Sequence, residues 1–187
     1  CRLSVIQDRA RLYSFDELFR MPRRIDWERY DVFHVPHYTL PFGIQIPTVI
    51  TVHDLIHVHH PERPYYPFIA RPLIRSALKR ATKVLAVSRA TYSDLVALAG
   101  SRERLVNKIR VIPNALDPLF LRPLRSADYV AQRFQIRSKF LLAVFSSVKP
   151  HKGLQDLLAA YQYVKSKAVN GNRGLGDVRL VLTGQGI

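Results

Sequence analysis

Short apolar runs rich in β-branched residues recur along the chain, and polar or helical stretches separate them. Several runs are apolar almost throughout, which is typical of strands buried on both faces of a parallel sheet. On this pattern we predict six strands, over residues 31–35, 47–52, 83–87, 108–112, 140–145 and 178–182.

Helical patterns alternate with these runs and predict helices over residues 68–81, 90–98 and 154–164. The second should begin after Ser88, a good capping residue, and end at Gly100. This alternation predicts an α/β fold with parallel sheets. The glycine-rich segment 171–176 precedes a predicted strand, whereas phosphate-binding glycines follow one, so we interpret it as a loop.

The alternation is interrupted over residues 117–138, which contain Pro118, Pro123 and only a short helical pattern. We interpret this segment as the crossing between a lobe of residues 1–116 and a second lobe that starts within 139–187. No apolar stretch approaches the roughly 20 residues of a membrane span, and no signal peptide opens the chain. The single cysteine cannot form an internal disulfide, which agrees with the cytoplasmic location that we expect.

The net charge of +15 is concentrated after residue 60. Residues 1–60 are neutral overall, whereas residues 61–125 carry 13 basic and 4 acidic side chains. Basic surface of this kind suits anionic lipid, phosphorylated substrates or nucleic acid, and a solvated helix face is the simpler alternative. Because no basic strand with interleaved aromatic residues appears, we do not expect nucleic acid as a partner.

Polar residues follow or end nearly every predicted strand. In open parallel sheets, ligands bind beyond the carboxyl ends of the strands, so these residues are candidates for a binding site. For Ser88, capping of the next helix is an alternative role. The candidates are His34, His53 with Asp54, Ser88, Asn114, Ser146 and Gly184.

Six of the seven histidines fall between residues 34 and 60, which raises the alternative of a zinc site. His53 and His57 are four apart, a spacing that aligns two ligands on a helix. Here the spacing follows a predicted strand, where the geometry is wrong, so we expect no metal.

A second cluster of polar residues spans residues 144–154, where a strand is followed by a turn and a predicted helix start. Lys149 and Lys152 lie three apart before Gly153. Free backbone N–H groups at a helix start, together with two ammonium groups, suit a diphosphate. A surface turn that happens to carry lysines is the alternative.

The order of these segments resembles glycosyltransferase family 4, in particular its mannosyltransferase-like branch acting in bacterial polysaccharide assembly. The matching stretches cover nearly the whole chain. They are residues 13–17, 31–41, 51–55, 85–88 with 94–95, 111–117, 149–153 and 180–184.

The resemblance implies a GT-B fold, with two Rossmann-like lobes facing a cleft. It implies a retaining transfer of a hexose, mannose from GDP-mannose as our guess, to a glycan or lipid-linked acceptor, with neither metal nor other cofactor. By analogy Lys152 contacts the diphosphate with Lys149 as a weaker candidate, and His53 orients a sugar hydroxyl or the acceptor. Residues 1–116 become the acceptor-side lobe and residues 139–187 the start of the nucleotide-sugar lobe. A peripheral contact with anionic lipid at the inner face of the plasma membrane is compatible with this.

The sequence also departs from the family pattern. Ser146-Ser147 stand where many relatives carry Gly-Arg, which places more of the phosphate binding on the lysines. Ala115 replaces a common glycine. The family's glycine-rich loop is expected before Cys1 and its paired glutamates after Ile187, so we expect that this polypeptide alone does not turn over. A basic module that binds nucleic acid or anionic membrane without catalysis is the alternative function.

Overall fold

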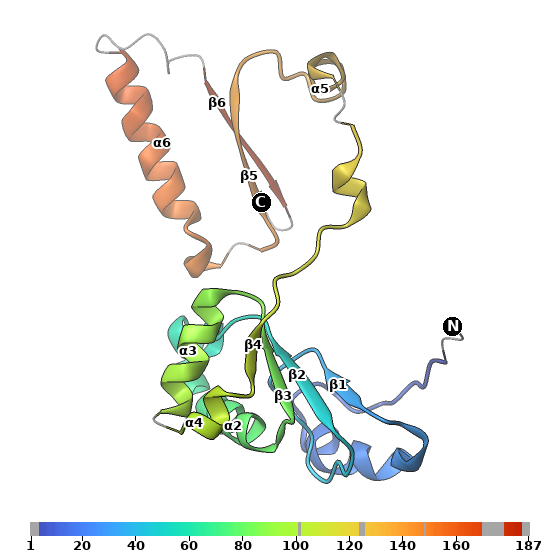
Figure 1. Ribbon diagram of the computed structural model, residues 1–187. Helices are drawn as coiled ribbons and strands as arrows, with labels where there is room; N and C mark the ends of the chain where they lie inside the picture. The colour runs from blue at the N-terminus through green and yellow to red at the C-terminus, as the bar shows by residue number, and fades with distance from the viewer. Residues whose placement is uncertain (1–3, 101, 124–125, 148, 170–177, 185–187) are drawn as a thin grey trace. The chain divides into compact units, whose positions relative to one another are not determined.

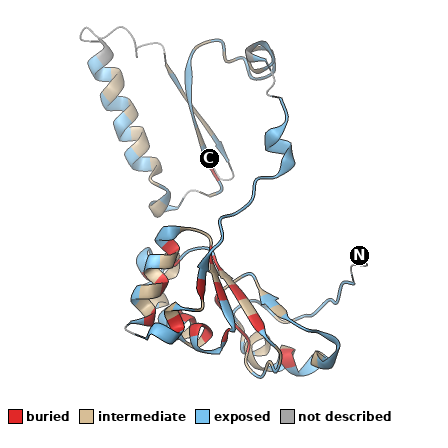
Figure 2. Cartoon of the chain, in the orientation of Figure 1, coloured by how far each residue is buried: buried red, intermediate tan, exposed pale blue. Residues whose placement is uncertain are grey.

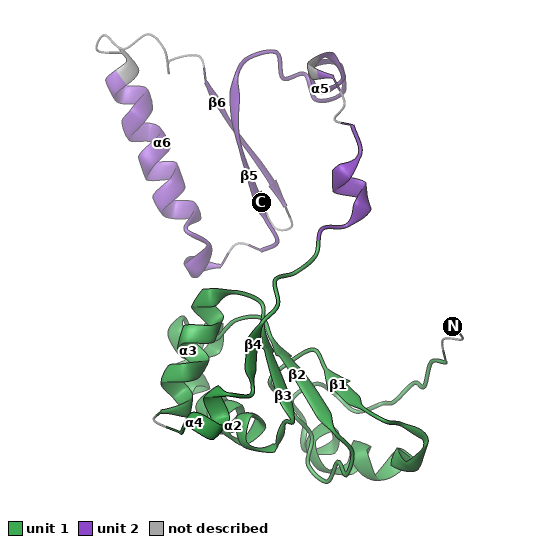
Figure 3. Ribbon diagram, in the orientation of Figure 1, with its two compact units in different colours: residues 1–115 green, residues 116–187 purple. Residues whose placement is uncertain are grey.

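The computed structural model describes residues 4–100, 102–123, 126–147, 149–169 and 178–184. The chain divides into two compact units, unit 1 of residues 1–115 and unit 2 of residues 116–187 (Figure 3). The predicted glycine-rich loop at residues 171–176 lies outside the described residues.

Unit 1 contains a four-stranded sheet in the order β1-β2-β3-β4 (Figure 1). All neighbouring strands are parallel, and Val52, Ala86 and Val111 at the ends of β2, β3 and β4 are register partners along the sheet. The carboxyl ends of these strands therefore meet at one edge. The strands are β1 (Phe33–Val35), β2 (Thr48–Val52), β3 (Lys83–Ala86) and β4 (Ile109–Val111).

Helices connect β2 to β3 and β3 to β4, as expected for parallel pairing, whereas residues 36–47 join β1 to β2 without a helix. The long helices α2 (Tyr66–Arg80) and α3 (Arg89–Ala99) extend the predicted ones by one or two residues at most ends. The short helices α1 (Ile56–His59) and α4 (Glu103–Val106) were not predicted, nor were three short helical segments at Asp16–Arg20, Met21–Arg24 and Trp27–Arg29. The prediction of an α/β fold with parallel sheets is confirmed.

The core of unit 1 lies between the sheet and its helices, where Ile50, Ile74 and Leu95 are fully buried (Figure 2). Along β2, the residues alternate between buried and half-buried. Burial on both faces, which the apolar runs predicted, is therefore wrong for this strand, because only one of its faces is fully covered.

Unit 2 contains a two-stranded parallel sheet of β5 (Phe140–Phe145) and β6 (Arg179–Gly184), with α6 (Leu154–Val169) between them in sequence. It also contains α5 (Ala127–Phe134) and short helical segments at Pro118–Leu121 and Pro150–Lys152. The Tyr161 hydroxyl of α6 donates to the Val178 carbonyl over 2.8 Å. Among the described residues, no helix of either unit combines the length and the apolar character of a membrane span.

Candidate active site

Residues that follow each strand of unit 1 lie at the carboxyl edge of its sheet. Pro36 and His37 follow β1, His53 follows β2, Ser88 stands two residues after β3, and Asn114 three residues after β4. The His53, Ser88 and Asn114 predicted from strand ends therefore belong to one edge. Both His53 and Asn114 have exposed side chains.

Hydrogen bonds of Ser88 and Thr91 link the residue after β2 to the start of α3. The Ser88 hydroxyl accepts a hydrogen bond from the Thr91 N–H over 3.1 Å, so its predicted role as the cap of α3 is confirmed. The Thr91 hydroxyl donates to the His53 carbonyl over 3.0 Å. These bonds fix the main chain of His53 and leave its imidazole exposed.

The prediction that His34 lies at the end of its strand is wrong. It lies in the middle of β1, and its Nε2 is 2.8 Å from the hydroxyl of Thr51 on β2. Since side chains alternate between the faces of a strand, His34 occupies a face of the sheet rather than the edge. The sequence alone does not indicate where so short a strand ends.

Two tyrosine–histidine pairs lie beside this edge. The Tyr13 hydroxyl is 3.2 Å from His37 Nε2, and the Tyr38 hydroxyl is 2.7 Å from His57 Nδ1. His37 Nδ1 accepts the Thr39 N–H over 3.2 Å, so in neutral His37 the proton lies on Nε2 and is donated to Tyr13. The members of each pair are 24 and 19 residues apart, which is why strand-end reasoning did not find them.

In each pair, burial favours the neutral form of one member, His37 in the first and Tyr38 in the second. Burial, followed by the charges of His57 and His53, lowers the pKa of His37 from its ordinary 6.5. Burial, with smaller effects of Tyr13 and Asp54, raises the pKa of Tyr38 to about 12. Both groups are therefore uncharged at neutral pH and form these hydrogen bonds in their neutral forms.

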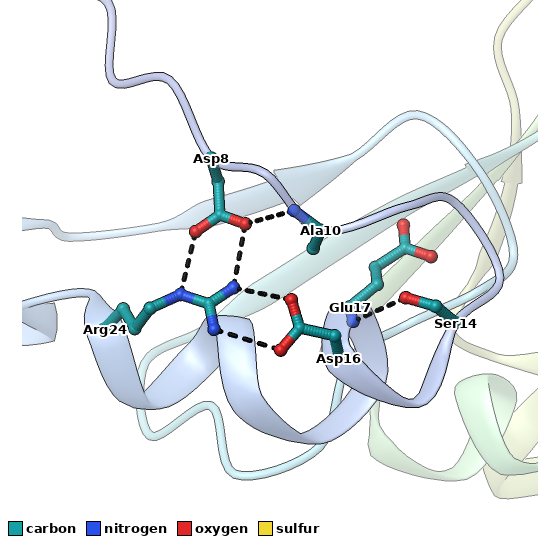
Figure 4. Close-up of polar contacts among 6 residues, drawn as sticks. All are labelled: Asp8, Ala10, Ser14, Asp16, Glu17 and Arg24. Atoms are coloured by element: carbon teal, nitrogen blue, oxygen red, sulfur yellow. Dashed lines mark hydrogen bonds and ion pairs between the residues drawn. The ribbon is translucent and has the colours of Figure 1, made fainter.

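The segment that carries Tyr13 is held by Arg24 (Figure 4). The Arg24 guanidinium donates to both oxygens of Asp8, at 2.9 and 2.8 Å, and to both oxygens of Asp16, at 3.1 Å each. The hydrogen bond from Arg24 lowers the pKa of Asp8. Tyr13 itself has a φ of 61°, a left-handed conformation that is costly for a tyrosine. The Arg24 bridge limits the freedom of this segment and so supports the position of Tyr13.

No three His, Cys, Asp or Glu side chains among the described residues lie close enough together to hold a metal ion. His53 precedes α1 and His57 lies within it, so the two do not share one helix face. His59, at the end of α1, is 3.2 Å from the carboxylate of Asp94 on α3.

In unit 2, the predicted diphosphate turn joins β5 to α6. Ser146 directly follows β5, Lys149 precedes the segment Pro150–Lys152, and α6 begins at Leu154, close to the predicted start. Gly153 adopts a left-handed φ of 68°, and its carbonyl accepts the N–H of Leu157 over 2.9 Å. The earlier N–H groups of α6 have no partner within the helix. The first turn also carries Asp156, which the strand-end pattern does not predict, and its carboxylate would oppose an anion bound there.

Gly184, at the end of β6, packs too closely against β5 for any side chain to fit. It is the register partner of Phe145 at the end of the sheet, with a φ of 151°. A Cβ at this position would lie 1.7 Å from the Phe145 carbonyl oxygen. Only glycine permits this approach, and it brings Ser146 and Gly184 to the same edge of the sheet of unit 2.

Comparison with known proteins identifies the first unit. The family model described as Glycosyltransferase Family 4 matches residues 2–119, which is more than half of the chain and includes nearly all of unit 1. No curated protein matches the chain. Domains of this family transfer a glycosyl group from a nucleotide-sugar to an acceptor. The chain belongs to glycosyltransferase family 4.

Proposed function

We propose that the protein transfers a hexose from a nucleotide-sugar to a glycan or lipid-linked acceptor, with retention, in the synthesis of a cell-envelope polysaccharide. The observation that carries the proposal is the shared carboxyl edge of unit 1, where His53, Ser88 and Asn114 follow adjacent parallel strands in a chain of this family. Mannose as the sugar, GDP-mannose as the donor and retention follow from the resemblance alone.

The donor diphosphate is proposed to bind at the start of α6. Lys152 is exposed and immediately precedes Gly153, and Lys149 is exposed three residues earlier. Ser146 and Gly184 lie at the neighbouring strand ends. The two ammonium groups and the free N–H groups of the helix start would stabilise the leaving diphosphate and offset the carboxylate of Asp156. On this proposal the nucleotide-sugar is a co-substrate, and the protein uses neither a metal nor another cofactor.

His53 is proposed to orient a hydroxyl of the transferred sugar or the acceptor. Its main chain is fixed through Thr91, whereas its imidazole is exposed at the carboxyl edge. A positioned hydrogen-bonding group of this kind contributes by orientation. Asn114 and Ser88 would line the same edge, with Ser88 limited by its capping bond.

A peripheral contact with anionic membrane at the inner face of the plasma membrane is also proposed. On α2, Phe68 is 80% exposed, and the exposed cations Arg71, Arg75 and Lys79 follow at helical spacing. Apolar and cationic groups on one exposed helix surface suit a lipid interface. Co-sedimentation with liposomes that does not depend on anionic lipid would remove this part of the proposal.

Nucleotide-sugar turnover tests the function. The assay measures release of nucleoside diphosphate from a panel of nucleotide-sugars by the full-length protein. Lys152→Ala should lower the rate by about 10²-fold, the scale of one lost charge partner at a developing charge. Lys167→Ala on α6 is a matched control. Abolition by EDTA, or an unchanged rate in Lys152→Ala, would contradict the proposed mechanism.

A further inference from the structure

An apolar pocket of about 380 Å³ opens in unit 1 beside the carboxyl edge of the sheet. This volume lies within the range of small-molecule sites, roughly 300–1,000 Å³. Tyr38 reaches the pocket from the segment after β1, His57 from α1, and Tyr13 from the N-terminal segment held by Arg24. None of these residues was assigned a role in the proposed transfer.

The polar atoms of the pocket are largely engaged with one another. The Tyr38 hydroxyl is bonded to His57, and the Tyr13 hydroxyl to His37 outside the pocket lining. Tyr13, Tyr38 and Tyr66 all meet the ring of His57 edge to face, with ring centroids 5.6–6.4 Å apart. The pocket therefore offers ring surfaces and few free hydrogen-bonding groups, which favours a hydrocarbon over a second sugar.

The other wall of the pocket is the first two turns of α2. Ile69, Ala70 and Leu73 line it together with Tyr66, and they recur at the spacing of one helix face. Ile69 is 54% exposed, and the neighbouring Phe68 and Tyr65 are 80% and 54% exposed. An exposed apolar turn thus adjoins the pocket, and the cations Arg71, Arg75 and Lys79 follow it on the same helix.

We propose that this pocket holds the hydrocarbon chain of an amphiphilic acceptor, an inference that rests on the glycosyl transfer proposed above. An acyl or isoprenoid chain matches the aliphatic and aromatic lining. The exposed apolar turn continues the apolar surface outwards. With its chain in the pocket, the sugar end of the acceptor would lie at the carboxyl edge, near His53.

The test measures binding of methyl, hexyl and octyl glucosides by calorimetry, each below its micelle concentration and with no donor present. Each buried methylene strengthens binding about fourfold. The affinity of the wild type should therefore rise at least tenfold from the methyl to the octyl glycoside. Ile69→Glu should abolish this gain, whereas Val32→Glu, at an equally exposed position outside the pocket lining, should retain octyl glucoside affinity within about twofold. Both positions are more than half exposed, so both variants should fold.

Methyl-detected NMR of Ile69 and Leu73 gives a second readout that needs no variant, and octyl glucoside should shift both signals. Equal affinities for methyl and octyl glucoside would overturn the inference. An equal loss in both glutamate variants would also overturn it, because the affinity gain would then not depend on the lining of the pocket. Since no donor is present, the outcome is independent of turnover. Transfer to water-soluble acceptors without chain-length dependence would refute the pocket and leave the proposed function standing.

Discussion

Units 1 and 2 each have an apolar strand in a parallel sheet, yet Ile50 on β2 is fully buried whereas Leu142 on β5 is 57% exposed. Unit 1 packs 17 buried residues into one core. In unit 2, Phe145 is the buried hydrophobic residue among those described. Among the described residues, the same strand pattern therefore gives a closed core in unit 1 and a largely exposed sheet in unit 2.

The largest expected difference is in core truncations. Ile50→Ala should destabilise unit 1 by about 2–5 kcal/mol, because it leaves a cavity in a closed core. Leu142→Ala should cost less than about 1 kcal/mol, because more than half of the side chain is already in solvent. Urea unfolding followed by fluorescence of Trp27, the single tryptophan, reports on unit 1, and circular dichroism reports on both units. Equal losses for the two variants would refute the contrast in burial.

Helix caps give a smaller, matched comparison. Ser88 caps α3 in unit 1, and Ser126 caps α5 in unit 2, where its hydroxyl accepts the Tyr129 N–H over 3.3 Å. Ser88→Ala should cost about 1 kcal/mol and also disturb the Thr91 bond to His53. Ser126→Ala should cost at most about 0.5 kcal/mol, because no described residue of α5 is buried. Unfolding midpoints of the two variants measure the difference, and a larger loss at Ser126 would contradict it.

The smallest expected effect is a pH dependence confined to unit 1. The pKa of His37 is lowered on folding from 6.5, so the unfolded chain binds the proton more readily. The contribution of neutral His37 to stability is therefore present above about pH 6.5 and is lost as the pH falls towards the lower folded pKa. His37→Gln should flatten the pH dependence of the Trp27 unfolding transition in this window. An unchanged slope would exclude His37 as its source.

The fold was largely predictable because strand and helix periodicities are local. All six strands and the three long helices lie within a few residues of their predicted positions, and Ser88 caps α3 as expected. Burial was less predictable, since the apolar run of β5 does not reveal what covers it. The position of His34 on a face of the sheet depends on where β1 ends and on what packs against each face, and the sequence shows neither. The Tyr13–His37 and Tyr38–His57 pairs depend on contacts between distant segments.

A titration of ¹⁵N-labelled protein with GDP-mannose tests most directly whether the donor binds on unit 2. The account predicts amide shifts concentrated at Lys152–Leu157 and Gly184, with an affinity at least tenfold lower in Lys152→Ala. Shifts confined to unit 1, or the same affinity in Lys152→Ala and the wild type, would contradict the placement of the diphosphate at the start of α6.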